Sequence, residues 1–180
     1  VSVTVCINDG DTHNSPTEQL EAKYPVLVEK YAIRQDSGGA GRYRGGLGAE
    51  MIVQALSPFT VTTRIDRVHC KPWGLEGGGD AAGNGLAVRH KGEWKTDHPN
   101  AKIFNVRLER GDAYKMLSGG GGGFGNPLDR ELDLVARDVR EGYVSASVAR
   151  EVYRVALDEK GRVDPQATAA LRSQQGRATC

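Results

Sequence analysis

The sequence predicts an α+β protein, in which a mainly antiparallel β domain of sandwich or barrel type is followed by a short helical segment. Short β-prone segments separated by turn residues fill the first 118 positions, with a single helical segment among them, and this spacing favours antiparallel pairing over a parallel sheet. After a glycine run, the apolar residues recur at helical spacing. We therefore expect a β-rich domain over residues 1–118 and, over 119–180, a glycine loop and helical segment packed on it as one unit.

Alternation of apolar and polar residues predicts the strands in order. Residues 1–7 alternate as a strand does, and Ser15, Pro16 and Glu18 combine a helix cap, a proline at the first helical position and a capping-box acid. Further strands are predicted in VLVEKYAIRQ, AEMIVQAL, FTVTTRI, GLAVRHKGEWKT, KIFNVRL and AYKML. We expect AEMIVQAL and FTVTTRI to form one hairpin around Ser57-Pro58, and GLAVRHKGEWKT to form another around Lys91-Gly92.

Helical periodicity dominates the last third of the chain. One apolar stripe predicts a helix with Pro127 in its first turn and Gly142 at its C-terminal end. Ser145 is placed to cap a second helix and Asp164 a third, with a small hairpin in YRVALDEKGRV between them. The residues of the stripe are Leu132, Val135, Ala136 and Val139.

Composition excludes several classes of protein. Lysine and arginine number 24 against 23 acids, for a net charge of +1, which argues against a nucleic-acid or membrane-surface binder. No apolar run reaches the roughly 18 residues of a membrane span. Cys6, Cys70 and Cys180 form no C-x-x-C pair, so we expect reduced thiols in a cytoplasmic protein. The histidines lack ligand spacing, so no metal site is expected in this chain. Because the chain starts with Val1 inside a predicted strand, we expect a piece of something longer: a fragment, a processed chain or a separately encoded half of a subunit.

Two glycine-rich stretches fail the tests for nucleotide loops. In DSGGAGRYRGGLG, Gly41 and Gly46 have the Walker spacing, but Leu47 and Gly48 stand where lysine and a hydroxyl are needed. GGGGGFG matches G-x-G-x-x-G only because it is mostly glycine, and no second strand of a βαβ unit follows. Two readings remain open: a close crossing of backbones where no β-carbon fits, or an ordered functional loop.

Arg42 and Arg44 are the candidate binding residues of the first stretch. Two residues apart, they share a side of an extended chain and, beside free N–H groups, suit a carboxylate or oxyanion. The alternative is surface pairing with Asp36 or Glu50. We expect the stretch to face a cleft, and we assign no catalytic residue. The candidate anion-binding residues are Asp36, Ser37, Gly38, Gly39, Arg42, Arg44, Asp66 and Arg67, with a glycine loop of Gly119, Gly120, Gly121, Gly122, Gly123 and Gly125.

Five segments in order carry a family resemblance. SPTEQLEAKYP, DSGGAGRYRGGLG, KPWGLEGG, GGGGGFGNPLDRE and ARDVREGYVSASVAREVY resemble the C-terminal part of the B subunit of hydantoinases and oxoprolinases, over about residues 12–157. The sequence departs from the family pattern at Lys71, where a second proline is usual, and at Ser15, where threonine is common.

The resemblance implies part of the B subunit of an ATP-dependent cyclic amidohydrolase, which opens a hydantoin- or 5-oxoproline-like lactam ring. Relatives carboxylate ketones, and a third reading is a scaffold, without catalysis of its own, that docks the ATPase subunit. The implied hetero-oligomer contains an actin-like ATPase subunit of hydantoinase A type that carries ATP and Mg. It also contains the upstream part of the B subunit, where a divalent metal is possible.

Overall fold

The computed structural model describes residues 16–173. The strand predicted at residues 1–7, the candidate cap Ser15 and the residues after 173 lie outside this range. The described chain divides into two compact units. The β unit consists of the chain up to Arg34 together with Gly48–Lys71 and Gly83–Gly119, and the glycine–helix unit consists of Gln35–Leu47, Pro72–Ala82 and the chain from Gly120 onward. Antiparallel sheets and a few helices confirm the predicted α+β class.

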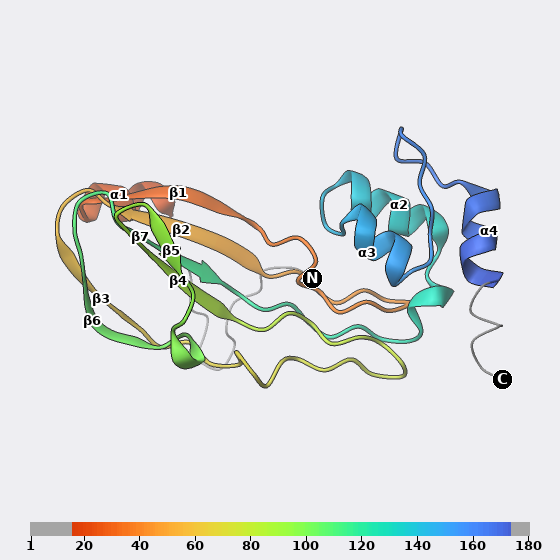
Figure 1. The fold of residues 1–180 in the computed structure, drawn as a ribbon, viewed down its shortest axis with the longest axis horizontal. Helices are drawn as coiled ribbons and strands as arrows, with labels where there is room; N and C mark the ends of the chain where they lie inside the picture. Colours follow the sequence, from red (N-terminus) through yellow and green to blue (C-terminus); the bar gives the residue numbers. More distant parts are fainter. Residues whose placement is uncertain (1–15, 174–180) are drawn as a thin grey trace. The chain divides into compact units, whose positions relative to one another are not determined.

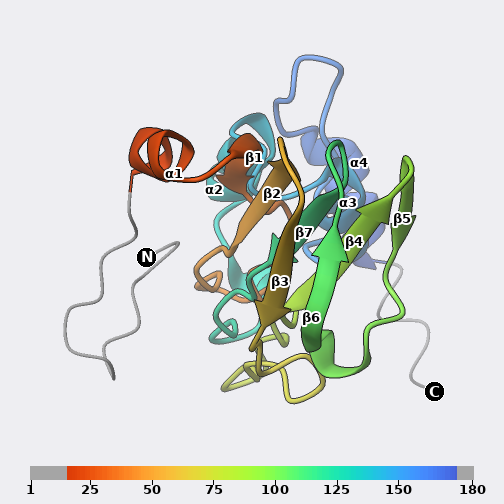
Figure 2. The same cartoon turned by 90° about the vertical axis from the view of Figure 1, so that its left-hand side faces the viewer.

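The β unit contains two antiparallel sheets (Figures 1 and 2). The five-stranded sheet has the order β1-β2-β7-β4-β5, and the two-stranded sheet pairs β3 with β6. The short helix α1 (Thr17–Lys23) precedes β1 as predicted, but Pro16 is its N-cap residue and not its first helical residue. A 3-10 turn, η2 (Pro99–Ala101), precedes β6. The strands are β1 (Val26–Ile33), β2 (Ala49–Ala55), β3 (Phe59–Thr63), β4 (Gly85–His90), β5 (Glu93–Lys95), β6 (Ile103–Leu108) and β7 (Ala113–Leu117).

One predicted hairpin is confirmed and the other is wrong. β4 and β5 pair around Lys91 and Gly92 as expected. β2 does not pair with β3; it pairs with β1 and β7, whereas β3 pairs with β6. The physical reason is the core, because Ala55 of β2 and Val61 of β3 are both buried in a cluster that contains residues of both sheets. A chain that crosses from one sheet to the other can cover this cluster from two sides.

Period-2 alternation builds the core of the β unit. Val53 pairs with Tyr114, and Tyr114 with Val88, so these three side chains share one face of the large sheet. Val61, Ile103 and Leu108 of the small sheet belong to the same apolar cluster as Val88. Burial raises the pKa of Tyr114.

Asp112 joins two turns of the β unit. Its side chain is buried and accepts hydrogen bonds from the backbone N–H of Glu109 at 2.9 Å and of Lys91 at 3.1 Å, and its Oδ2 lies 2.9 Å from Nδ1 of His90. Burial by itself acts to raise the pKa of Asp112, but the two N–H donors and His90 outweigh it and hold the pKa below its usual value.

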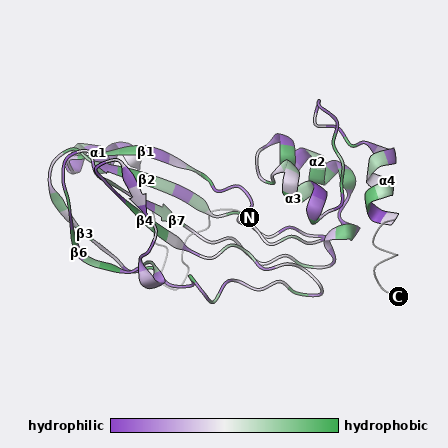
Figure 3. Cartoon of the chain, viewed as in Figure 1, coloured by the Kyte–Doolittle hydropathy of each residue, from purple (hydrophilic) through white to green (hydrophobic). Residues whose placement is uncertain are grey.

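Three extended segments of the glycine–helix unit lie side by side without forming regular strands (Figure 1). Each is hydrogen-bonded to both others: Gly39 N–H donates to the Gly121 carbonyl at 2.9 Å, Gly79 N–H to Ala40 at 2.7 Å, and Gly123 N–H to Gly79 at 2.9 Å. We name residues 35–47, 72–82 and 120–126 the glycine bundle. Its segments are mostly pale in Figure 3, neither hydrophobic nor hydrophilic, so its cohesion comes from the backbone.

Close backbone approach explains the glycines of the bundle. A Cβ atom on Gly45 would overlap the carbonyl oxygen of Gly121, and one on Gly122 would overlap the carbonyl oxygen of Trp73. Any other residue at Gly45 or Gly122 would push the segments apart and break their hydrogen bonds. Of the two readings that the sequence left open, the close crossing of backbones is therefore present.

Helices follow the bundle and form a second apolar core. A 3-10 turn, η3 (Pro127–Asp129), precedes α2 (Leu132–Arg140), α3 (Ala146–Glu151) and α4 (Pro165–Ser173). Val135, Val144 and Tyr153 are among its buried residues. The Ser145 hydroxyl accepts from Val148 N–H at 3.2 Å, and the Asp164 carboxylate from Ala167 N–H at 3.0 Å, which confirms both predicted caps.

Three further expectations concern the segments that flank these helices. Pro127 begins the separate turn η3 instead of α2, because Arg130 and Glu131 adopt extended backbone angles between the two elements. Gly142 has a φ of 73° and ends the helix as predicted. Leu157 pairs with Val163, which confirms the small hairpin.

Replacing Asp112 with asparagine should make the chain less stable and less sensitive to acid. A lowered folded-state pKa contributes stability above the unfolded pKa of about 3.9, and this stability is lost as the pH falls through the folded value. We expect Asp112→Asn to cost about 1.5–3 kcal/mol at neutral pH and its melting temperature to fall less steeply than that of the wild type below about pH 4. Thermal melts from pH 7 to pH 2.5 measure both, with the exposed Asp97→Asn as control. If the melting temperatures of the wild type and Asp112→Asn fall in parallel as the pH is lowered, this role of Asp112 is contradicted.

Two adjacent glycines of the bundle should differ strongly in how well they tolerate alanine. Gly122→Ala forces a Cβ against the Trp73 carbonyl, whereas a Cβ on Gly121 meets its nearest atom, the Gly46 nitrogen, at an ordinary 3.4 Å. We expect Gly122→Ala to lower the free energy of unfolding by about 1–3 kcal/mol or more and Gly121→Ala to change it by less than about 0.5 kcal/mol. Urea denaturation of both variants checks this; equal effects would show that backbone packing is not the constraint.

Candidate functional site

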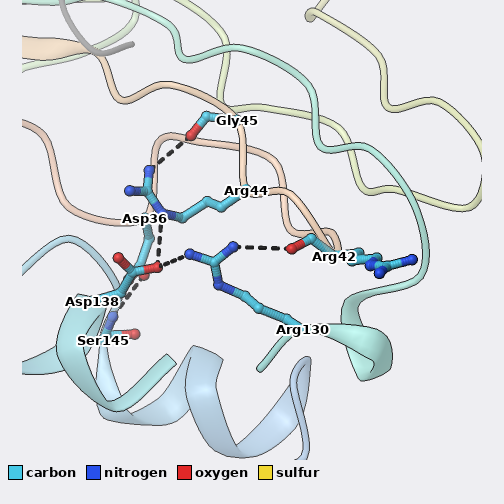
Figure 4. Close-up of polar contacts among 7 residues, drawn as sticks. All are labelled: Asp36, Arg42, Arg44, Gly45, Arg130, Asp138 and Ser145. Atoms are coloured by element: carbon cyan, nitrogen blue, oxygen red, sulfur yellow. Dashed lines mark hydrogen bonds and ion pairs between the residues drawn. The ribbon is translucent and has the colours of Figure 1, made fainter. Parts of the chain in front are cut away.

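A buried carboxylate on α2 anchors the first segment of the glycine bundle (Figure 4). Asp138, 1% exposed, accepts hydrogen bonds from Nε of Arg44 at 3.0 Å and from Nη2 of Arg130 at 2.8 Å. We name Arg44, Arg130 and Asp138 the Asp138 network. Its arginines also hold the bundle's backbone: Arg44 donates to the Gly45 carbonyl at 2.8 Å, and Arg130 to the Arg42 carbonyl at 3.1 Å.

Two aromatic side chains pack beside the Asp138 network and help to fix it. The guanidinium of Arg44 lies 5.5 Å from the ring centroid of Tyr143, a stacking distance for a cation on an aromatic face. Tyr153 is fully buried and is hydrogen-bonded to the backbone N–H of Gly41; burial raises the pKa of its hydroxyl. Arg44 is thus held by charge, hydrogen bonding and stacking together.

Asp36 and Ser37 also make contacts that fix the backbone. The Asp36 carboxylate accepts from Ser145 N–H at 2.8 Å, and its own N–H donates to the Tyr143 carbonyl at 3.1 Å. Asp36 has a φ of 57°, a left-handed conformation that aspartate tolerates better than most residues. Ser37 is completely buried, and its carbonyl accepts from Ala82 N–H at 2.9 Å.

Arg42 differs from these residues because its guanidinium is available. The side chain is exposed, lies over the Tyr43 ring at 5.6 Å, and points away from the Asp138 network (Figure 4). Within residues 16–173 the guanidinium has no hydrogen bond or ion pair. Its backbone, by contrast, is held on both sides, since its N–H donates to the Gly125 carbonyl at 3.2 Å and its carbonyl accepts from Arg130. A free guanidinium on a fixed backbone can bind a carboxylate or phosphate oxygen.

The remaining candidates belong to the β unit. Asp66 is exposed and pairs with Lys102 at 2.8 Å, and the hydrogen bond and charge of Lys102 lower its pKa. Arg67 has a φ of 57°, and its carbonyl accepts from Asn84 N–H at 3.2 Å. Gly119 N–H donates to the Asn84 side chain. The glycine bundle itself contains Asp36, Ser37, Gly38, Gly39, Arg42, Arg44, Gly120, Gly121, Gly122, Gly123 and Gly125.

Sequence reasoning missed Asp138 and Arg130. The alternative partners that it considered for Arg44 were Asp36 and Glu50, whereas the acid that binds Arg44 lies 94 residues away in sequence. A signal was present, because Asp138 follows Val135 by three positions and so lies on the apolar side of its helix. No group of three or more His, Cys, Asp or Glu side chains in residues 16–173 is arranged to hold a metal ion. None of the helices in that range is long and apolar enough to cross a membrane.

Removing the charge of Asp138 should destabilise the glycine–helix unit strongly. Asp138→Asn keeps the shape of the side chain but leaves the buried guanidinium of Arg130 and the partly buried one of Arg44 without their counter-charge. Breaking a buried ion pair costs about 3–5 kcal/mol. The control is Asp133→Asn, an exposed acid in the first turn of the same helix, for which we expect less than about 1 kcal/mol. Chemical denaturation compares the two; equal losses would show that the Asp138 network is dispensable.

Comparison with known proteins shows that this chain is similar in sequence to the members of one protein family. The sequence profile of the family described as hydantoinase B/oxoprolinase matches residues 1–127. The beta subunit of caprolactamase from Pseudomonas jessenii is 35% identical over 162 residues, which are 87% of this chain and 27% of that protein. The B subunit of a putative D-/L-hydantoinase from Pseudomonas sp. (strain NS671) is 29% identical over 162 residues, which are 90% of this chain and 27% of that protein.

Solved structures agree with the sequence matches. The ATP-dependent caprolactamase from Pseudomonas jessenii superposes with a TM-score of 0.73 at 30% identity, over 88% of this chain and 28% of that one. Nucleotide-free acetone carboxylase gives a TM-score of 0.76 at 29% identity, over 91% of this chain and 26% of that one. The chain thus spans about a quarter of the length of these relatives. It belongs to the hydantoinase B/oxoprolinase family.

Proposed function

We propose that this chain is part of the B subunit of an ATP-dependent cyclic amidohydrolase that opens a hydantoin- or 5-oxoproline-like lactam ring. The observation that carries the proposal is its similarity, over 87% of its length, to a subunit named for a lactam-hydrolysing enzyme. A second relative of similar coverage is named for hydantoins. Both names designate one subunit among several, which supports the presence of a partner subunit in the enzyme. We propose that this partner is an actin-like ATPase that carries ATP and Mg.

The chemistry explains why such an enzyme couples to ATP. A ring amide is a poor electrophile, and transfer of the γ-phosphoryl group of ATP to its carbonyl oxygen makes the ring carbon reactive toward water. Opening of the C–N bond then leaves ADP, phosphate and a carboxylate, which is an amino carboxylate from a simple lactam and a carbamoylamino carboxylate from a hydantoin. Two water molecules are consumed overall. Negative charge develops on oxygen at each stage, and fixed cationic donors stabilise such charge.

Arg42 is the residue of this chain that we propose for that role. Its guanidinium is exposed and unpaired among the described residues, while its backbone is held by Gly125 and Arg130. A planar fork on a fixed backbone can bind a carboxylate or phosphoryl group through two hydrogen bonds. Arg44, by contrast, is engaged by Asp138, and we propose that it serves the anion site by holding the bundle.

A second function has its own support. Acetone carboxylase superposes at a TM-score of 0.76, which favours a subunit of a ketone carboxylase. Carboxylation would use the same phosphoryl activation on bicarbonate instead of a lactam. A scaffold role, in which this chain docks the ATPase subunit without touching substrate, predicts that Arg42 is irrelevant to turnover.

Turnover by the assembled enzyme that contains this chain tests the proposal. ADP release and product formation are measured with hydantoin, 5-oxoproline and caprolactam, and separately with acetone plus bicarbonate. We expect ADP release that depends on a lactam, and a loss of about tenfold or more in Arg42→Ala because one charge-assisted contact of about 1.5–3 kcal/mol disappears. Arg137→Ala, another exposed arginine of the same unit, is the matched control.

The alternative outcomes are distinct. Activity with the ketone alone would replace the amidohydrolase by the carboxylase. Full lactam turnover by Arg42→Ala, at an unchanged melting temperature, would assign the scaffold role.

A further inference from the structure

An exposed apolar patch lies on the glycine bundle. Tyr43, Trp73, Leu75 and Phe124, which we name the aromatic patch, are between 47% and 67% exposed. They come from all three segments of the bundle. Single exposed apolar residues are ordinary on protein surfaces, but a contiguous group of large ones marks an interaction site.

Backbone pairing makes the patch contiguous. Tyr43 and Phe124 exchange two backbone hydrogen bonds of 3.0 Å, and their ring centroids lie 6.3 Å apart. Leu75 pairs with Phe124 on its other side, through N–H donation to Gly123 at 2.9 Å and acceptance from Gly125 at 3.0 Å. Residues directly opposite each other in paired extended chains project their side chains to the same side, so Phe124 lies between Tyr43 and Leu75.

Trp73 extends the patch along the same pair of segments. The Trp73 carbonyl packs against the α-carbon of Gly122, two residues before Phe124, just as Trp73 itself is two residues before Leu75. The glycine packing that creates this contact also fixes the backbone beneath the patch. Preorganised aromatic groups lose little conformational freedom on binding, and aromatic residues are enriched at the centres of interfaces.

We propose that the aromatic patch docks the portion of a hydantoinase B-type subunit that this chain does not represent. The inference rests on the proposed role as part of a B subunit. The chain matches only 27% of the length of each of the two curated relatives, so most of such a protein remains to be accommodated. Permanent interfaces are more apolar than transient ones. A patch of three aromatic rings and a leucine therefore suits a permanent contact inside the B subunit more than an exchanging contact with an ATPase partner.

A binding measurement with a defined probe tests this surface. The probe is the caprolactamase β subunit of Pseudomonas jessenii from which the region matched by this chain has been deleted, co-expressed with the chain or titrated against it. We expect the wild type to bind and Trp73→Ser and Phe124→Ser to bind at least tenfold more weakly. Phe104→Ser is the matched control, because Phe104 is 79% exposed but lies on β6 of the β unit, and it should bind as the wild type does. Melting temperatures of the free variants establish that they fold, and Leu75→Ser replaces any variant that does not.

Several results would overturn the proposal. These are failure of the wild-type chain to bind the truncated probe, binding by the patch variants equal to wild type, or loss of binding in Phe104→Ser as well. A doubled mass of the chain in sedimentation, abolished by Trp73→Ser, would assign the patch to a second copy instead. Binding is measured without ATP or lactam, so an enzyme without lactam turnover leaves this result standing, and loss of docking does not decide the reaction.

Discussion

Backbone packed directly on backbone is the interaction on which the glycine–helix unit depends. Three segments that are distant in sequence approach so closely that a β-carbon at Gly45 or Gly122 would overlap a carbonyl oxygen. Glycine is usually unfavourable in an ordered segment because it loses more conformational freedom on folding than any other residue. Here that cost is offset by hydrogen bonds that each segment makes to both others, and by the rigid surface that results.

The buried carboxylate of Asp138 attaches the glycine bundle to the helices. The bundle has few side chains with which to hold the helices, and Asp138 binds two arginines that in turn hold the carbonyls of Arg42 and Gly45. A carboxylate this deeply buried is tolerated only when its charge is paired. The two arginines of the first segment therefore differ in role. Arg44 fixes the backbone of the segment, whereas the guanidinium of Arg42 has no hydrogen bond or ion pair among the described residues.

Local features of the fold could be predicted from the sequence, and nonlocal ones could not. Periodicity, caps and turn residues identified α1, the β4–β5 hairpin, α2 and the caps at Ser145 and Asp164, because neighbours along the chain determine them. The partner of β2 was predicted wrongly, since sheet pairing is settled by which apolar faces meet. Glycine composition indicated a close crossing but not which segments cross. Arg42 and Arg44 were identical in pattern, and only the distant Asp138 separates them.

Amide hydrogen exchange at the bundle glycines tests whether the three segments are packed and hydrogen-bonded backbone to backbone. Gly39, Gly79, Gly121 and Gly123 lie in no helix or regular strand, yet each N–H donates to a backbone carbonyl of a neighbouring segment. We expect these amides to be protected as strongly as those of the central strand β7 and far more than the amide of the exposed turn glycine Gly92. Exchange of the bundle amides at the rate of Gly92 would contradict it, because the segments would then be ordinary loops.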